Sequence, residues 1–238
     1  MARGETLGRR ERLRAEATAE IKNVALELMA SGGPDAITLR AIAREMGMTA
    51  NAIYGYFATR DDLVTTLIND VSTALADAVD AAWEATSTSD PATRIRAWAD
   101  AFRNWSLANP QGFRLIFGDP VPGYHPPEGG AAPGATRRIC LGLTALAAAA
   151  WPHAAHLYMD SEFDWSDFDP GFLDEVRPAF PDLPPAAVAL ALRIRGHLHG
   201  LVSLEVYGHM RTQTLSPDKL FHEELTHLVR TLDATAPN

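Results

Sequence analysis

The sequence predicts an all-α protein, with a small N-terminal helical domain in residues 1–60 and a larger helical domain in residues 61–238. Apolar residues recur at three- and four-residue spacing through most of the chain, which is the period of an α-helix. Several segments also begin with a capping side chain followed by proline, which is a favoured start of a helix. These segments are Asp90-Pro91, Asn109-Pro110 and Ser216-Pro217.

Composition limits the class of protein. The 238 residues are 47% hydrophobic, enough for one or two domains with a sizeable core. No signal peptide is recognisable, and the longest apolar run, Leu141 to Trp151, is too short to span a bilayer. The single cysteine, Cys140, excludes an intramolecular disulfide and argues against a cysteine-built metal site. We therefore expect a soluble, cytoplasmic protein without a metal or other cofactor.

Charge is unevenly distributed along the chain. Residues 1–60 carry nine Lys or Arg against seven Asp or Glu, a balance of +2, whereas residues 61–238 carry twelve against twenty-three, a balance of −11. This separation would orient the first domain towards a polyanion. The arginines near the N-terminus fit two interpretations, a basic arm that reaches DNA or a solvated tail. They are Arg3, Arg9, Arg10, Arg12 and Arg14.

The first helix is expected to begin within Glu11–Ala19 and to end at Ala30, because Ser31-Gly32-Gly33-Pro34 would stop it. Its apolar face consists of Ile21, Val24, Ala25, Leu28 and Met29. That face has nothing to pack against except the segment that follows. Three helices are therefore expected to form one small core.

The segment Thr38–Phe57 is typical of a helix-turn-helix. Gly47 can adopt the left-handed conformation that ends one helix, and Thr38 and Thr49 can each cap the start of a helix. The apolar residues that would face inwards are Leu39, Ile42, Ala43, Met46, Ile53 and Phe57. The alternative is an ordinary pair of packed helices joined by a glycine turn.

The second helix of this pair leaves small and hydrogen-bonding groups outward, which suits a helix lying in the major groove of DNA. Asn51 is predicted to read bases, while Thr49, Tyr54, Tyr56 and Arg60 would hold phosphates. In the first helix of the helix-turn-helix, the N-terminus can also meet a phosphate. Two outward arginines of the same helix serve either as phosphate contacts or as plain surface residues. The predicted DNA-binding residues are Thr38, Arg40, Thr49, Ala50, Asn51, Tyr54, Gly55, Tyr56 and Arg60, with Arg44 as the second outward arginine.

The run Tyr54-Gly55-Tyr56-Phe57, followed by Thr59-Arg60-Asp61-Asp62-Leu63, resembles the N-terminal domain of the tetracycline-repressor (TetR) family over roughly Ala19–Ile68. That family carries a Tyr-x-x-Phe run and a basic residue just before an acidic pair and a leucine. The resemblance implies a homodimeric transcriptional regulator that binds double-stranded operator DNA. Gly55 departs from the pattern, because many members have a larger residue there, and this leaves the operator sequence open.

Thr59-Arg60-Asp61-Asp62 is a capping box that opens a long helix. Its apolar stripe consists of Leu63, Leu67, Val71, Leu75, Ala78 and Ala82. The helix should continue to about Ala85 and span about 25 residues, or roughly 40 Å. It is expected to link the two domains mechanically.

Two helices of the second domain carry aromatic faces, which line either a ligand cavity or an ordinary core. One presents Ile95, Trp98, Ala99, Phe102 and Trp105, and the next presents Phe113, Leu115, Ile116 and Phe117. The predicted ligand-binding residues are Trp98, Phe102, Trp105, Phe113, Phe117, Thr144, Trp165 and His197. An apolar small molecule is the expected ligand.

The middle of the second domain is less regular. Asp119–Gly134, rich in proline and glycine, is predicted to be an exposed loop, and Ala135–Ala150 a helix buried on most sides. Pro152–Pro185 is predicted to be an irregular, solvated segment that can cover a pocket. Its motif Asp160-x-Glu162-x-Asp164 fails the calcium-loop pattern, because Trp165 stands where that loop needs glycine.

Pro185–Met210 is expected to be the longest helix of the second domain, and the last helix should run from Pro217 to about Ala234. The face of the last helix would be Phe221, Leu225, Leu228 and Leu232. His199-Gly200 resembles a histidine-glycine motif of one C-terminal subclass of the TetR family. A glycine within a helix costs about 1 kcal/mol relative to alanine, so Gly200 is expected to permit close helix approach. His197 and His199 either face a ligand or are satisfied within a core or interface.

In the TetR family the last two long helices pair with those of a second subunit in a four-helix bundle, and we expect the same here. The sequence thus predicts a repressor released from a near-palindromic operator, with half-sites roughly 34–36 Å or a multiple apart, by an apolar effector. The alternative is a dimeric DNA-binding regulator without a small-molecule ligand. An enzyme is not expected, because the sequence contains no Gly-x-Ser-x-Gly, His-Glu-x-x-His or glycine-rich phosphate-loop motif.

Overall fold

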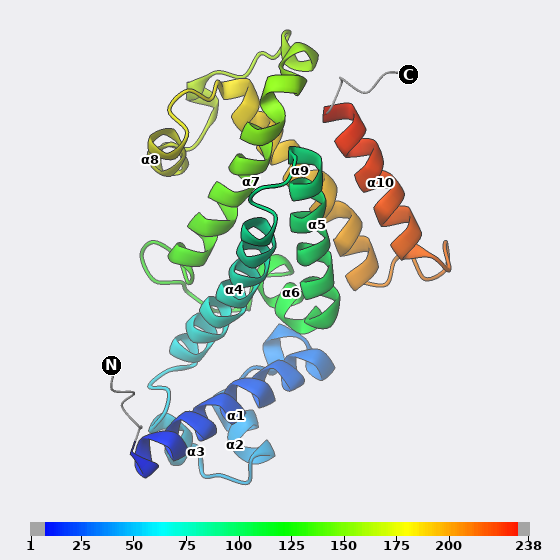
Figure 1. Cartoon of the computed structure of the whole chain (residues 1–238). Coiled ribbons are helices and arrows are strands. Elements are labelled where there is room, and N and C mark those ends of the chain that lie inside the picture. The colour runs from blue at the N-terminus through cyan, green and yellow to red at the C-terminus, as the bar shows by residue number, and fades with distance from the viewer. Residues whose placement is uncertain (1–7, 233–238) are drawn as a thin grey trace. The chain divides into compact units, whose positions relative to one another are not determined.

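The computed structural model describes residues 8–232, and within that range every regular element is a helix. Ten α-helices and three short 3₁₀ helices follow one another along these residues (Figure 1). The all-α prediction is confirmed. Two predictions lie outside the described residues: the arm or tail position of Arg3, and the end of the last helix at about Ala234.

The chain folds as two compact units. The first extends to Val71 and also contains Gln111–Ala132, whereas the second comprises Ser72–Pro110 and the chain from Pro133 onwards. The chain therefore passes from one unit to the other at three places: within α4 (Arg60–Ala85), at the start of α6 (Pro110–Phe117) and before α7 (Pro133–Ala154).

The first unit is built around α1 (Arg9–Gly32), α2 (Leu39–Glu45) and α3 (Ala50–Tyr54). Helix α1 begins two residues before the predicted range, because the carboxylate of Glu11 accepts a hydrogen bond from the backbone N–H of Gly8 at 2.9 Å. Gly33, with φ of 74°, ends it. The predicted inward residues form one core with the start of α4, and the fully buried members are Ile21, Ala25, Ile37, Ile42, Ile53, Leu63 and Val64.

Helix α4 begins with the predicted capping box. The N–H of Asp62 donates to Thr59 Oγ1 at 3.0 Å, and the N–H of Thr59 donates to Asp62 Oδ2 at 3.0 Å. Both groups would otherwise lack a partner at the helix N-terminus. The helix runs for 26 residues to Ala85, as the apolar stripe predicted.

The segment after α6 is not the fully exposed loop that its proline and glycine content suggested. Val121 is 5% exposed and packs into the core of the first unit. The hydroxyls of Tyr124 and Thr65 are 2.9 Å apart, which attaches the segment to α4. The prediction failed because two apolar side chains within the loop find a surface on a helix that lies far away in sequence.

The second unit contains α5 (Pro91–Ala108), α7, α8 (Pro170–Ala179), α9 (Pro185–Val206) and α10 (Pro217–Leu232). Helices α5, α7 and α9 pack against one another, and α10 packs against α5 and α7 (Figure 1). Asp90 caps α5 as predicted, accepting a hydrogen bond from the N–H of Thr93 at 3.0 Å.

Three expectations for the second unit were wrong. Pro152–Pro185 is not irregular throughout, because Asp169 caps α8 by accepting from the N–H of Phe172 at 3.1 Å, and Pro170 occupies the first turn. Helix α9 ends at Val206, and its 22 residues only equal those of α7. On α10 it is Val229, 4% exposed, that joins the core in place of Leu228.

An ionic network centred on the buried Arg103 ties three helices of the second unit together. Arg103 on α5 is 7% exposed, and its Nε and Nη2 each donate to the carboxylate of Glu205 on α9 at 2.8 Å. Its Nη1 donates to Asp218 Oδ1 on α10 at 2.7 Å. The hydrogen bonds that Arg103 donates to Glu205, followed by the charge of Glu205 and the pairing with Asp218, raise the pKa of Arg103 against the opposing effect of burial.

Candidate nucleic-acid interface and ligand cavity

The turn between α2 and α3 has the geometry of a helix-turn-helix. Gly47 has φ of 64°, and the N–H of Met48 donates back to the carbonyl of Ala43 at 2.8 Å. Thr38 Oγ1 accepts from the N–H of Ala41 at 3.1 Å, and Thr49 Oγ1 accepts from the N–H of Ala52 at 3.2 Å. Both predicted threonine caps are therefore formed.

Helix α3 is five residues long and turns its polar side outward. Asn51 and Gly55 are exposed, Tyr54 is 49% exposed, and Ala50 is half-buried. Ile53, fully buried, fixes the opposite face against the core. Thr38, which caps α2, and Arg40 on α2 are both exposed. Arg44 at the end of α2 and Thr49, which caps α3, are exposed as well.

Gly55 follows the last residue of α3. A Cβ at this position would lie 3.2 Å from the carbonyl oxygen of Ala52, which is tighter than ordinary contact. A larger residue would therefore require a small shift at the end of the helix.

The arginines near the N-terminus belong to α1 rather than to an extended arm or tail, with the exception of Arg3, which is outside the described range. Arg9, Arg10, Arg12 and Arg14 are all helical. Arg14 Nη2 donates to the carbonyl of Gly55 at 2.8 Å, and its guanidinium lies 5.0 Å from the centre of the half-buried Tyr56 ring. Arg14 thereby connects α1 to the end of α3.

The Arg60 side chain links separate segments of the first unit through hydrogen bonds to backbone carbonyls. Its Nε donates to the carbonyl of Ile37 at 2.6 Å and its Nη1 to the carbonyl of Pro122 at 2.8 Å. Its Nη2 is 3.5 Å from the carbonyl of Pro34. With its donors directed at backbone carbonyls, the guanidinium joins the start of α4 to the turn before α2 and to the segment after α6.

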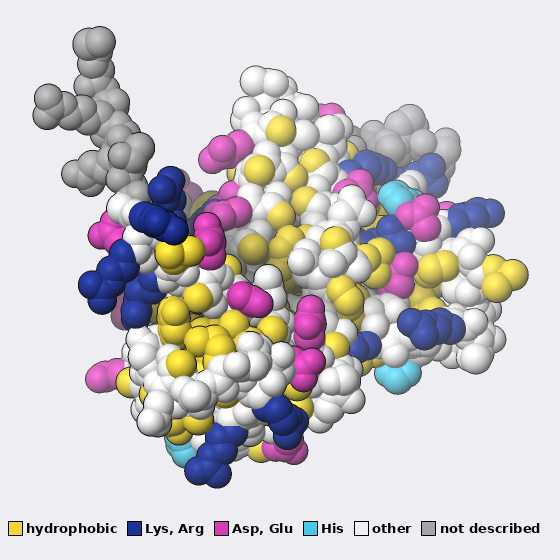
Figure 2. Space-filling view, turned by 90° about the horizontal axis from the view of Figure 1, so that it is seen from below, with side chains coloured by type: hydrophobic (Ala, Val, Ile, Leu, Met, Phe, Trp, Pro, Cys, Tyr) yellow, Lys and Arg dark blue, Asp and Glu magenta, His cyan; other side chains and the backbone are white. Residues whose placement is uncertain are grey.

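Positive charge on the first unit occurs in separate groups. Its exposed arginines lie on α1 and α2 and include Arg9, Arg10, Arg12, Arg40 and Arg44. Figure 2 shows one face of the molecule, on which Lys and Arg side chains gather in groups with acidic and hydrophobic side chains between them. This distribution suits phosphate contacts at separate points along a backbone.

The aromatic residues predicted to bind a ligand are divided between the two units. Trp98 and Phe102 are 3% and 5% exposed, and their rings stack with centroids 5.8 Å apart in the core of the second unit. Trp105, on the same helix, is half-buried. Phe113 and Phe117 belong to the first unit, with ring centroids 5.0 Å apart.

The other predicted ligand residues are dispersed in the second unit. Trp165 packs near Phe168, with ring centroids 6.3 Å apart, in a small cluster beneath α8. His197 Nε2 lies 3.9 Å from a carboxylate oxygen of Glu224 on α10. Thr144 is fully buried in α7 and borders a cavity.

That cavity, which we call the α7–α9 cavity, has a volume of about 290 Å³. It lies between α7, the start of α8 and α9, and its lining residues are Cys140, Leu143, Thr144, Asp167, Phe168, Asp169, Phe172, Ala191, Leu192 and Arg195. Sequence reasoning identified only Thr144 among them. The missed signal was Asp169-Pro170, a capping residue before proline of the same kind as Asp90-Pro91, which would have revealed α8 and the wall it provides.

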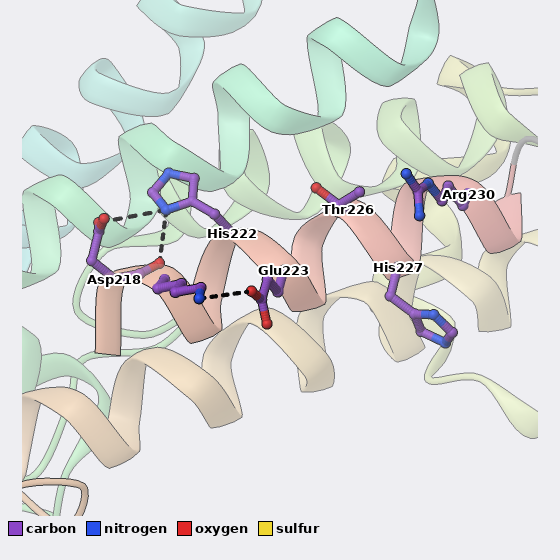
Figure 3. A pocket seen from close by; sticks show the side chains of 7 residues that line it. Asp218, His222, Glu223, Thr226, His227 and Arg230 are labelled. Atoms are coloured by element: carbon purple, nitrogen blue, oxygen red, sulfur yellow. Dashed lines mark hydrogen bonds and ion pairs between the residues drawn. The ribbon is translucent and has the colours of Figure 1, made fainter. Parts of the chain in front are cut away.

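A second, shallow groove follows the outer face of α10. Figure 3 shows that its side chains all come from that helix, including Asp218, His222 and Glu223. His222 Nε2 lies 3.3 Å from Asp100 Oδ1, and its Nδ1 lies 2.8 Å from the backbone carbonyl of Asp218. Burial raises the pKa of Asp100, against the opposing influence of His222. This polar, self-paired surface lacks the apolar enclosure of a small-molecule site.

Comparison with known proteins decides the family. Residues 21–67 match the family described as bacterial regulatory proteins, tetR family, and residues 95–228 match the tetracyclin repressor-like C-terminal domain. The chain belongs to the TetR family of transcriptional regulators. It is a helix-turn-helix DNA-binding protein, and TetR regulators bind operator DNA and dimerise.

Relatives match over nearly the whole chain. The HTH-type transcriptional regulators Rv1816 of Mycobacterium tuberculosis and Mb1846 of Mycobacterium bovis are each 31% identical, with 94% of both chains covered. The solved structure of the regulatory protein SCO4313 is 35% identical with a TM-score of 0.70, and covers 93% of this chain and 98% of its own. A TetR-family protein from Rhodococcus RHA1, 19% identical with a TM-score of 0.62 and coverage of 91% and 97%, shares the fold.

Residues 8–232 contain neither a membrane-spanning helix nor a cluster of metal-ligating side chains. Within that range no helix is long and apolar enough to cross a membrane. Over the same residues, no group of three or more His, Cys, Asp or Glu side chains is placed to hold a metal ion.

Proposed function

We propose that this TetR-family protein is a repressor that binds a near-palindromic operator as a homodimer and leaves it when a small apolar effector occupies the second unit. The DNA-binding part of this proposal is supported mainly by the geometry of α3. Its start is capped by Thr49, its inner face is held by Ile53, and Asn51 and Tyr54 are presented outward. A short capped helix with exposed polar side chains is what entry into a major groove requires.

The role of each predicted DNA-binding residue can be assigned from the exposure of its side chain and from the contacts that the side chain already makes within the protein. Asn51 reads a base edge, with Ala50 and Gly55 leaving room for close approach. Thr38, Arg40, Thr49 and Tyr54 contact phosphates, since all four are exposed. Tyr56 and Arg60 are better assigned to positioning, because Tyr56 packs beneath Arg14 and the donors of Arg60 point at backbone carbonyls.

Dimerisation is assigned to α9 and α10. Helix α9 has an exposed stripe at four-residue spacing that consists of Leu192, Gly196, Gly200 and Leu204. A Cβ at Gly196 or Gly200 would meet no atom within 4 Å, so neither glycine serves a close approach within the subunit. Two glycines in a helix cost about 1 kcal/mol each relative to alanine, a cost that close packing against a second subunit would offset.

Signal transfer to the first unit is assigned to the places where the chain crosses between the units. Helix α4 begins in one unit and ends in the other, and the segment 111–132 returns from the second unit to the first. Arg60 binds this returning segment at Pro122 and the turn before α2 at Ile37. An effector that binds one arrangement of these elements more tightly than the other would shift the protein between DNA-binding and released states.

The test is selection of bound duplexes from a random DNA library by the purified protein at about 150 mM salt, where non-specific binding is weakened. Enrichment of two inverted half-sites is the expected result. Asn51→Ala should relax the preference at one base pair of each half-site, whereas the matched change Asn23→Ala on α1 should leave the selected sequence unchanged. Enrichment of a single, non-repeated sequence would contradict the symmetric dimer.

A further inference from the structure

The α7–α9 cavity is mostly apolar. Leu143 of α7, Phe168 and Phe172 around the start of α8, and Ala191 of α9 form its walls. Its volume of about 290 Å³ is close to the lower end of the range of about 300–1,000 Å³ for small-molecule sites. An occupant must therefore be compact and mainly hydrocarbon.

Most polar groups of the cavity are already used by the fold. The buried hydroxyl of Thr144 donates to the carbonyl of Cys140 at 2.9 Å. Asp169 Oδ1 accepts from the N–H of Phe172 at 3.1 Å as the cap of α8, and Asp167 Oδ2 accepts from the N–H of Asp164 at 2.8 Å. Each carboxylate is thus held by a backbone donor, and Asp169 also lies at the positive end of a helix dipole.

Arg195 differs from these groups. Within residues 8–232 it makes no hydrogen bond and no ion pair, although it lines the same cavity. Arg103 and Arg138 of the second unit, by contrast, are paired with the carboxylates of Glu205 and Asp80. Its positive charge is felt inside the cavity: burial raises the pKa of the Cys140 thiol, and Arg195 opposes that rise.

We propose that the α7–α9 cavity binds a compact apolar carboxylic acid, with its hydrocarbon part between Leu143, Phe168 and Phe172 and its carboxylate on Arg195. A guanidinium without a protein carboxylate at an apolar cavity is suited to pair with a carboxylate from a ligand. The inference rests on the proposed function in one respect, since it names the chemical class of the effector. The cavity also shares Leu192 with the exposed stripe of α9, so an occupant would contact the helix assigned to dimerisation.

Three ligands with the same eight-carbon chain test the head group: octanoate, 1-octanol and octylamine. Isothermal titration calorimetry with the full-length protein is expected to show saturable binding with the order octanoate, then 1-octanol, then octylamine. Octanoate should also slow alkylation of Cys140 by N-ethylmaleimide, measured by mass spectrometry at about pH 8, because this thiol lines the cavity and is the single cysteine of the chain. Equal or tighter binding of octylamine would overturn the proposal, since it would assign the site to Asp167 and Asp169.

Arg195→Met provides the decisive variant, and Arg193→Met is its matched control. Arg193 is an exposed arginine two residues away on α9 that lies over the Tyr158 ring, 5.0 Å from its centre, and does not line the cavity. Arg195→Met should weaken octanoate binding by up to about fivefold and leave 1-octanol binding unchanged, the effect of losing one ion pair at an exposed position. An equal effect of Arg193→Met would show that only the overall charge matters and would refute the site.

These measurements use no DNA, so their failure is distinct from failure of the proposed function. If octanoate binds in an Arg195-dependent manner but random-library selection yields no operator, the cavity proposal stands and the repressor proposal fails. If an operator is recovered while none of the three ligands binds, the cavity proposal fails and DNA recognition stands. Release of the selected operator by octanoate, lost in Arg195→Met, is the result expected when both are correct.

Discussion

Replacement of Arg103 by methionine provides the strongest test of how the second unit is held together. Methionine keeps an unbranched side chain of similar reach near Phe221, whose ring centre lies 5.1 Å from the guanidinium carbon. The substitution removes two hydrogen bonds to Glu205 and one to Asp218. It therefore removes the ionic link between α5 and both helices assigned to dimerisation, while the apolar packing between them remains.

The expected cost comes almost entirely from Glu205. Its side chain is 14% exposed, so the variant leaves a largely buried carboxylate without its cation, a change that costs about 3–5 kcal/mol. Asp218 is 69% exposed, and loss of its pair adds no more than about 1 kcal/mol. We expect the free energy of unfolding to fall by about 3–6 kcal/mol. At 2–4 °C per kcal/mol for a chain of this size, the melting temperature should fall by roughly 6–24 °C.

The assay is thermal and urea unfolding at one fixed protein concentration, because the stability of a dimer depends on concentration. Glu205→Gln in the Arg103→Met background should recover part of the loss, since the stranded charge is then gone. Lys219→Met is the control: it removes an exposed pair with Glu223 at 3.7 Å and should cost less than about 0.5 kcal/mol. A loss below about 1 kcal/mol for Arg103→Met, or no recovery with Glu205→Gln, would refute the reasoning.

Three further predictions concern the other features. Gly200→Leu should raise the helix propensity of α9, and its side chain would extend into open space within the subunit. Analytical ultracentrifugation should nevertheless show weaker dimers. Unchanged dimer affinity would place the interface elsewhere. Arg40→Met should reduce the salt dependence of DNA binding by about one phosphate contact, whereas Arg60→Met should mainly lower the melting temperature. The reverse pattern would exchange the roles of the two arginines. Burial, reinforced by the charge of Arg195, lowers the pKa of His199, so the free energy of unfolding should decrease as pH falls below about 6.5. His199→Gln should make that decrease smaller. An unchanged pH profile in the variant would contradict this role of His199.

Local features of the fold could be predicted from the sequence. The threonine caps of α2 and α3, the left-handed Gly47 and the capping box at Thr59 all formed as expected. Each depends on groups no more than four residues apart, so the residues that decide the conformation are also those that lie together in sequence. Even the missed helix α8 carried such a signal in Asp169-Pro170.

The tertiary structure decided which surfaces and cavities exist. It directs Arg60 to three backbone carbonyls, places the segment 111–132 in the first unit, and leaves Gly200 facing open space. It also brings Cys140, Phe172 and Arg195 around one cavity, although they come from three different helices. The sequence by itself determined most of the helices, their caps and the family, because those depend on short-range periodicity and on motifs. The roles of individual side chains depend on which helices pack together, and that is set by burial summed over the whole chain.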